Sequence, residues 1–158
     1  MTEPASGMLS PDALELAYER IFAAPPERVF HAWTDAGVLA RWWGPKSFTI
    51  PEVSLDVRVG GAWMTLMRAP DGAEYRVGGV YREIDPPRRL VFTWAWLNDG
   101  VRGHETTVTV EFEAARGGTL MRFHQARFAD SGDAARHNEG WTSAFECLDH
   151  LIAEAGLA

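Results

Sequence analysis

From Pro45 to about residue 126, apolar and polar residues alternate with a period of two, and only short turn signals interrupt the pattern. Those signals are Gly60-Gly61, Pro70-Asp71-Gly72, Asp85-Pro86-Pro87, Asn98-Asp99-Gly100 and Gly117-Gly118. Connections this short join antiparallel neighbours, because a parallel crossover needs about a dozen residues or more. The segment therefore predicts about six strands of one antiparallel sheet.

The segment before Pro45 predicts one strand and two short helices. The strand starts at Leu14 and stops at Pro25-Pro26, which open a helix because proline is tolerated in a first helical turn. A second short helix covers 35–43 and ends at Gly44-Pro45. Residues 1–12 are expected to form a flexible arm, and 13–158 a single domain, since this length supports one core.

The last segment, 131–155, has the period of a helix. Its apolar stripe consists of Trp141, Phe145, Leu148 and Ile152. A long helix beside an antiparallel sheet buries such a stripe against the concave face, which predicts an α+β fold with a curved sheet of six to seven strands. Where the sheet bends around the helix, a gap between them is a natural ligand site.

The amino-acid composition limits the classes of molecule that the protein is expected to bind. The chain has 15 basic and 22 acidic residues, a net charge of −7, which disfavours binding to nucleic acid or to an anionic membrane. From the sequence we expect neither a signal peptide nor a membrane-spanning apolar run, and the single cysteine, Cys147, cannot form an internal disulfide. We therefore expect a cytoplasmic monomer or homodimer that binds neither nucleic acid nor membrane.

Metal, nucleotide and nucleophile motifs are missing from the sequence. No two of the five histidines have metal-ligand spacing with a thiol or carboxylate, and the glycine pairs lack the following helix of a phosphate loop. There is no Gly-x-Ser-x-Gly elbow, and Cys147, between Glu146 and Leu148, is expected to be a small core or boundary residue. The sequence predicts no metal and no cofactor.

Large apolar side chains dominate the faces that the alternation turns inward, and they have two interpretations. They form an ordinary core, or some of them line a cavity for an apolar or aromatic molecule. The candidate pocket residues are Trp42, Trp63, Met67, Tyr81, Trp94, Phe123, Trp141 and Phe145. Trp33 and Trp43, on the short helices, are candidates for a movable lid.

Arg20 follows the alternation onto the inner face of the first strand. A buried guanidinium needs a carboxylate, and Asp35 or an acid on a strand is the expected partner. The arginine then serves either a structural salt bridge or ligand recognition.

Several short motifs together carry a family resemblance. They are Arg20-Ile-Phe-Ala-Ala-Pro25, Val29-Phe-His-Ala-Trp-Thr-Asp35, Trp42-Trp-Gly-Pro45, Gly60-Gly-Ala-Trp63, Gly79-Val-Tyr-Arg-Glu-Ile84, Thr93-Trp94 and Gly140-Trp141. With them, the stretch from about 14 to 155 resembles the activator of heat shock protein 90 ATPase homologue-like family of the START-like, or SRPBCC, superfamily. The resemblance implies the helix-grip fold of the birch pollen allergen, with a cavity that relatives use for lipids, polyketides or hormones.

Three functions remain open. The first is binding of a small hydrophobic or aromatic molecule in the cavity. The second is a co-chaperone-like module in the stress response, which would contact a chaperone through the exposed sheet face. The third is a cyclase- or hydrolase-type enzyme in which a pocket acid or histidine moves a proton. A large enclosed cavity favours the first or the third, whereas a filled interior with an exposed apolar patch favours the second.

Overall fold

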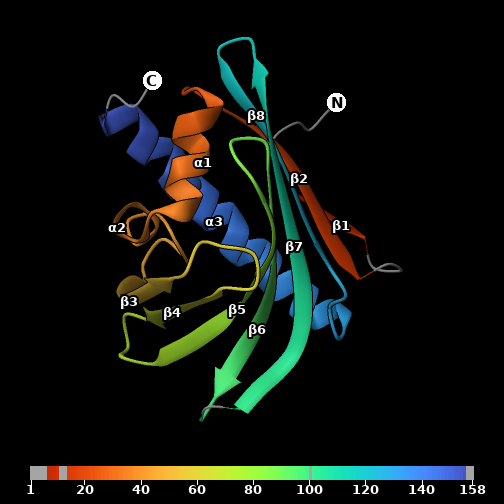
Figure 1. Cartoon of the computed structure of the whole chain (residues 1–158). Coiled ribbons are helices and arrows are strands. Elements are labelled where there is room, and N and C mark those ends of the chain that lie inside the picture. The colour runs from red at the N-terminus through yellow and green to blue at the C-terminus, as the bar shows by residue number, and fades with distance from the viewer. Residues whose placement is uncertain (1–6, 11–13, 100, 156–158) are drawn as a thin grey trace.

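The computed structural model describes residues 7–10, 14–99 and 101–155. Its eight strands form one antiparallel sheet in the order β1-β2-β8-β7-β6-β5-β4-β3 (Figure 1). The strands are β1 (Gly7–Ser10), β2 (Glu15–Phe22), β3 (Thr49–Leu55), β4 (Ala62–Arg68), β5 (Glu74–Asp85), β6 (Arg89–Asn98), β7 (Val101–Ala115) and β8 (Gly118–Ala126). The helices are α1 (Pro26–Thr34), α2 (Ala36–Leu39) and α3 (Ser131–Ala155).

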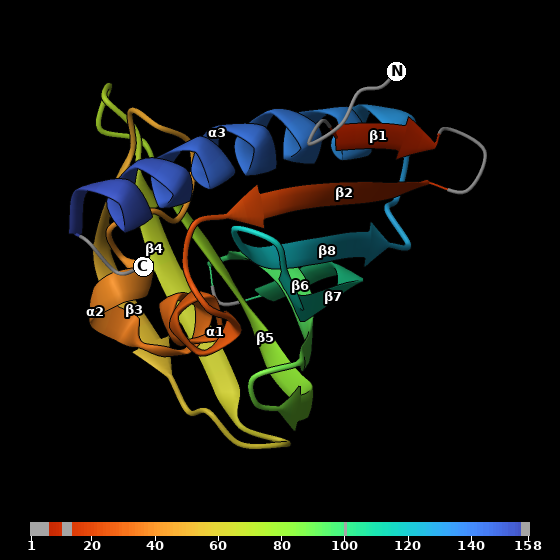
Figure 2. The same cartoon turned by 90° about the horizontal axis from the view of Figure 1, so that it is seen from above.

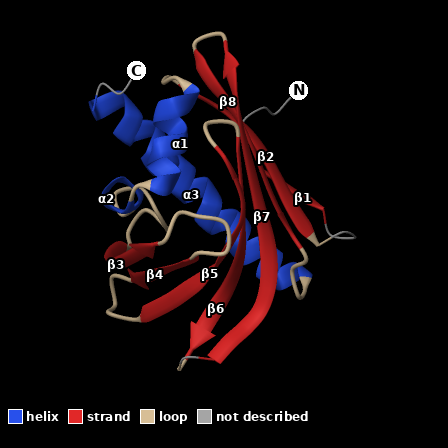
Figure 3. Cartoon of the chain, viewed as in Figure 1, coloured by secondary structure: helices blue, strands red, loops and turns tan. Residues whose placement is uncertain are grey.

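The sheet curves, and the helices lie together on one side of it (Figure 3). The view from above shows the long helix α3 running across the sheet, with α1 and α2 close together near its C-terminal end (Figure 2). This is the helix-grip arrangement expected from the sequence.

The predicted strands and helices are confirmed. The seven strands β2 to β8 match the predicted number, and α3 covers the predicted range. Within the expected N-terminal arm, residues 7–10 form β1, which pairs with β2 from Gly7↔Tyr18 to Ser10↔Glu15. Strand pairing there uses backbone groups, and the short run Gly-Met-Leu-Ser has no alternation from which a strand could be predicted. Residues 1–6 and 11–13 lie outside the described part of the chain.

The inward faces also follow the predicted alternation. On the strands, the buried inward residues are Trp63, Thr65, Met67, Leu90, Phe92, Trp94, Thr106, Val108, Val110, Phe112, Met121, Phe123 and Gln125. On α3 they are Trp141, Ala144, Phe145, Leu148, Leu151 and Ile152. The helix stripe therefore packs on the inner face of the sheet.

Local irregularities bend the sheet. The register of β5 against β6 shifts between Tyr81 and Glu83, and that of β6 against β7 shifts between Ala95 and Leu97. Such bulges increase the twist of a strand pair. At Gly79 a Cβ would lie 1.9 Å from the Thr93 carbonyl oxygen, so only glycine allows the strands to approach this closely.

Aromatic rings fill the middle of the core. Trp33 is at its centre, with its ring 4.8 Å from Trp42 and 6.2 Å from Phe123 between centroids. The Trp42 indole donates to the carbonyl of Ala32 at 3.0 Å. The remaining void in this region has about 10 Å³, and a cavity needs about 10–15 Å³ to hold even one water. This part of the interior is packed.

Candidate functional site

A cavity of about 520 Å³ lies at the other end of the interior. Its wall combines the first half of α3, the inner face of β4 to β6 and the loop that follows α2. Six aromatic rings line it: Trp43, Phe48, Tyr75, Trp94, Trp96 and Trp141. This size lies within the range of ~300–1,000 Å³ that is typical of small-molecule pockets.

Local structure places these rings around one space. Trp94 and Trp96 alternate onto the same face of β6, whereas Trp141 comes from α3. The loop between α2 and β3 is tied to α3 through Lys46, whose backbone N–H donates to Ser143 Oγ at 2.7 Å. The Lys46 ammonium also donates to Glu146 Oε1 at 2.8 Å. The loop with Trp43 is thereby held against the helix.

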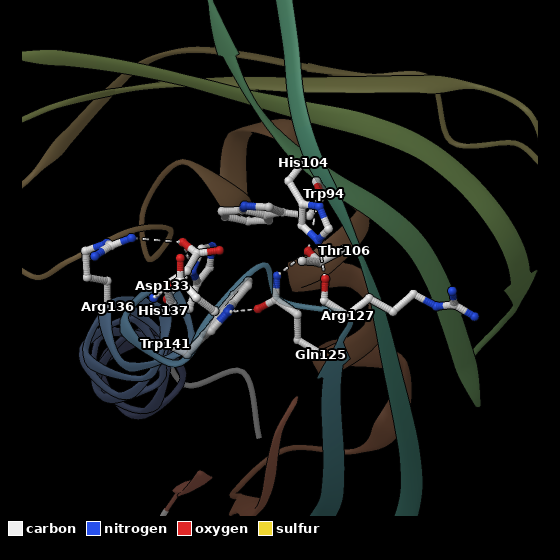
Figure 4. Close-up of polar contacts among 10 residues, drawn as sticks. Trp94, His104, Thr106, Gln125, Arg127, Asp133, Arg136, His137 and Trp141 are labelled. Atoms are coloured by element: carbon white, nitrogen blue, oxygen red, sulfur yellow. Dashed lines mark hydrogen bonds and ion pairs between the residues drawn. The ribbon is translucent and has the colours of Figure 1, made fainter. Parts of the chain in front are cut away.

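A chain of hydrogen bonds orients two of the wall residues (Figure 4). The Trp141 indole donates to Gln125 Oε1 at 2.7 Å, and the Gln125 amide donates to Thr106 Oγ1 at 2.8 Å. The Thr106 hydroxyl donates to the carbonyl of Trp94 at 3.3 Å. The network connects α3, β8, β7 and β6 and fixes the Trp141 ring in one orientation.

His137 is the buried histidine of the cavity wall. Its Nδ1 lies 3.0 Å from the carbonyl oxygen of Asp133, one turn earlier on α3. Its ring packs against Phe128 at 4.9 Å and Trp94 at 5.5 Å between centroids. Burial in these surroundings lowers the pKa of His137 below its usual value, an effect that outweighs the opposing influence of Asp133. The imidazole is therefore neutral at pH 7.

Two buried polar atoms of this wall have no hydrogen-bond partner within residues 7–10, 14–99 and 101–155. They are the indole Nε1 of Trp94 and the imidazole Nε2 of His137. The third such atom in the described chain, Nε1 of Trp33, belongs to the packed core. Most buried polar groups are paired in native proteins. Two unpaired atoms on adjacent rings of a cavity wall therefore mark a place where a bound molecule could supply the hydrogen-bond partners.

The charged residues on the cavity wall are held in ion pairs. Glu74 is bound by Arg68 at 2.7 Å. Arg76 is bound to Glu52 at 3.0 Å. Asp133 and Arg136 pair with each other at 3.4 Å. These charges partly neutralise one another, which leaves the aromatic rings as the dominant surface of the cavity.

The predicted pocket residues separate into two groups. Met67, Trp94 and Trp141 line the cavity. Those that lie in the packed core instead are Trp42, Trp63, Tyr81, Phe123 and Phe145. Of the two predicted lid residues, Trp43 is part of the cavity wall, and Trp33 sits at the centre of the core.

Arg20 points to α3. Its guanidinium lies 3.8 Å from Asp149 Oδ2, and its side chain is 18% exposed. The expected partner Asp35 has another role, because its carboxylate accepts from the backbone N–H of Val38 and caps α2. Arg20 is not on the wall of the cavity, and its observed contact is a salt bridge between β2 and α3.

Sequence reasoning did not single out His137 or Gly140 for the site. His137 lies four residues before Trp141, so extending the α3 stripe by one turn toward the N-terminus would have found it. Gly140 also lines the cavity, and a Cβ built there meets no atom within 4 Å. An alanine or larger residue therefore has space at this position.

The described residues offer neither a metal-binding cluster nor a membrane-spanning helix. No group of three or more His, Cys, Asp or Glu side chains is arranged to hold a metal ion. None of the described helices has the length and apolar character needed to span a bilayer.

Comparisons with known proteins assign the family. The family model described as "Activator of Hsp90 ATPase homolog 1-like protein" matches residues 23–153. No curated protein matches the chain. Among solved structures, the AHSA1 protein from Silicibacter pomeroyi is similar at 33% identity, with a TM-score of 0.83, over 89% of this chain and 99% of that one.

Two further structures, both determined in solution by NMR, have the same fold. A protein from Arthrobacter aurescens is 26% identical with a TM-score of 0.84, over 96% of this chain and 93% of that one. The AHSA1-like protein from Aeromonas hydrophila is 26% identical with a TM-score of 0.75, over 91% and 95% of the two chains. The chain belongs to the Activator of Hsp90 ATPase homolog 1-like family, within the START-like, or SRPBCC, superfamily.

Proposed function

We propose that this protein binds a small, neutral and largely aromatic molecule in the cavity between the first half of α3 and strands β4 to β6. The observation that carries the proposal is the cavity of about 520 Å³ with six aromatic rings on its wall. Ligand pockets are typically concave and apolar, with a few polar groups that fix orientation. Membership of a superfamily with a helix-grip fold fits this role.

The pairing of charges favours a neutral ligand. Arg76 and Arg136 each already have a carboxylate partner. The Glu74 carboxylate is likewise paired with an arginine, Arg68. A charged ligand would have to give up its own hydration to compete with these pairs. An uncharged ring system meets no such penalty and can stack on the indoles.

The outer face of the sheet is less suited to docking a chaperone through apolar contacts. Arg122 bridges Glu19 and Glu113 there, at 3.2 and 2.8 Å. Arg89 likewise contacts both Glu83 and Glu111. Ladders of ion pairs keep a surface hydrated, which supports the ligand-binding proposal over the co-chaperone alternative.

Proton-transfer catalysis is a second candidate function, and His137 is the observation that favours it. Burial keeps its imidazole neutral, and Nε2 has no partner in the described structure. A neutral imidazole can act as a general base toward a bound molecule. If the protein is an enzyme, a molecule that co-purifies with it is converted on incubation, and His137→Phe abolishes the conversion.

The binding test uses naphthalene as a minimal neutral aromatic probe, with isothermal titration calorimetry and thermal unfolding as readouts. A ligand that binds only the folded state stabilises it by about 2.7 kcal/mol at a hundredfold excess over Kd. We expect saturable binding to the natural chain and to Gly140→Ala. Gly140→Phe, whose ring enters the cavity from an open position, should bind at least tenfold more weakly.

Gly140→Ala is the matched control. It also replaces the glycine in the helix, but its methyl group leaves most of the cavity free. Equal affinity in Gly140→Phe and Gly140→Ala would place the probe elsewhere. A failure of naphthalene, and of a broader set of neutral two- and three-ring aromatics, to bind the natural chain would overturn the proposed function.

A further inference from the structure

We propose that the cavity selects a ligand that carries a hydroxyl group on an aromatic ring, with the hydroxyl bound between Trp94 and His137. This inference rests on the proposed function and adds the chemical class of the ligand. Its basis is the position of one unpaired donor and one unpaired acceptor on adjacent rings of the cavity wall.

The tautomer of His137 determines what its free nitrogen can accept. Nδ1 lies 3.0 Å from the Asp133 carbonyl oxygen, an acceptor, so Nδ1 must carry the proton. Nε2 of the neutral ring is then a hydrogen-bond acceptor. It therefore needs a donor, and none of the described residues supplies one.

Trp94 has the complementary need. An indole N–H can only donate, and Nε1 of Trp94 has no acceptor within the described structure. Both residues are at least nine-tenths buried, with 6% exposure for Trp94 and 7% for His137. Leaving buried polar atoms unpaired is unfavourable, so a group that satisfies both is bound preferentially.

A hydroxyl group meets both needs at once, because its proton can be donated to His137 Nε2 while its oxygen accepts from Trp94 Nε1. A carbonyl or an ether oxygen satisfies only the indole, and an ammonium satisfies only the imidazole. The two ring centroids are 5.5 Å apart, and Figure 4 shows the rings as neighbours on one side of the site. Because Trp94 Nε1 and His137 Nε2 are buried, the two rings have to move apart for the hydroxyl to reach them.

The remaining wall accounts for the aromatic body of the ligand. Trp141 lies 5.3 Å from Trp94 between centroids and is held by its hydrogen bond to Gln125. Trp43 lies 5.5 Å from Trp94. A ring attached to the hydroxyl therefore enters a space that is already walled by fixed indoles.

The experiment compares three probes of nearly equal shape: 2-naphthol, 2-methoxynaphthalene and naphthalene. Calorimetric affinities are measured for the natural chain, His137→Phe and Trp94→Phe. In the natural chain we expect 2-naphthol to bind about tenfold more tightly than naphthalene, with the methyl ether between them because it can accept but cannot donate.

The variants separate the two contacts. His137→Phe should bring 2-naphthol and the methyl ether to the same affinity while naphthalene still binds. Trp94→Phe should remove the advantage of the ether over naphthalene. His137→Phe keeps a ring of similar size among Phe128, Trp94 and Trp96, and far-UV circular dichroism checks that both variants are folded.

The outcomes distinguish this inference from the proposed function. Equal affinity of the three probes for the natural chain would overturn the hydroxyl inference and leave the aromatic cavity in place. A preference for 2-naphthol that persists unchanged in both variants would also overturn it. No binding of any of the three probes would overturn the hydroxyl inference, and the proposed function falls with it when the broader set of neutral two- and three-ring aromatics also fails to bind.

Discussion

Replacing Gly140 with alanine should make the protein more stable. The residue lies well inside α3, where glycine is less favourable than alanine by about 0.5–1 kcal/mol because the unfolded chain loses more freedom on folding. The new Cβ meets no atom within 4 Å, so no steric penalty opposes the gain. For a domain of 158 residues the gain corresponds to about 1.5–3 °C in Tm.

Urea unfolding followed by far-UV circular dichroism and tryptophan fluorescence measures this change, with Tm as a second readout. Gly132→Ala is the matched control, because Gly132 lies in the first turn of the same helix and off the cavity wall. It should give a smaller gain and leave probe binding unchanged. A loss of stability in Gly140→Ala would refute the reasoning, because it would mean that this part of the cavity wall is closed.

Three further predictions concern the core and the cavity wall. Phe145→Ala should destabilise the fold by about 3–5 kcal/mol in urea unfolding, because the ring is 1% exposed; a loss below about 1 kcal/mol would contradict its place in the core. Gln125→Leu should cost about 1–3 kcal/mol, because it leaves the Trp141 indole without its acceptor; an unchanged midpoint would show that the bond adds nothing. Because the pKa of His137 is lowered in the folded state, the unfolded chain binds more protons just below pH 6.5, and stability falls as the pH drops through this range. His137→Phe should show a smaller loss between pH 7 and pH 5.5, and identical losses would contradict the assignment.

The sequence predicted the strands better than it predicted the cavity, for a physical reason. Alternation decides which face of a strand is buried, and it placed Trp63, Trp94 and Phe123 correctly on the inner face. It does not decide where facing side chains leave space. Trp63, for example, finds a backbone acceptor in Thr93 at 2.9 Å and packs fully into the core.

The sequence also did not reveal which side chains far apart in the chain would contact each other. The Arg20 guanidinium meets Asp149, which is far away in the chain, whereas the nearer Asp35 is used for a helix cap. The position of His137 was accessible in principle, because it continues the apolar stripe of α3 by one turn. Its significance depends on the unpaired nitrogen, which only the folded arrangement reveals.

The order of the strands also determines how this chain can fold. Strands β3 to β7 each pair with the next strand in the chain, so β3 to β8 can form as successive hairpins while the polypeptide is being synthesised. Strand β2 pairs with β8, from Leu16↔Gln125 to Phe22↔Thr119, and closing this long loop carries an entropic penalty. Strand β2 is synthesised before strands β3 to β8. It can therefore pair with β8 only after almost the whole sheet has been synthesised.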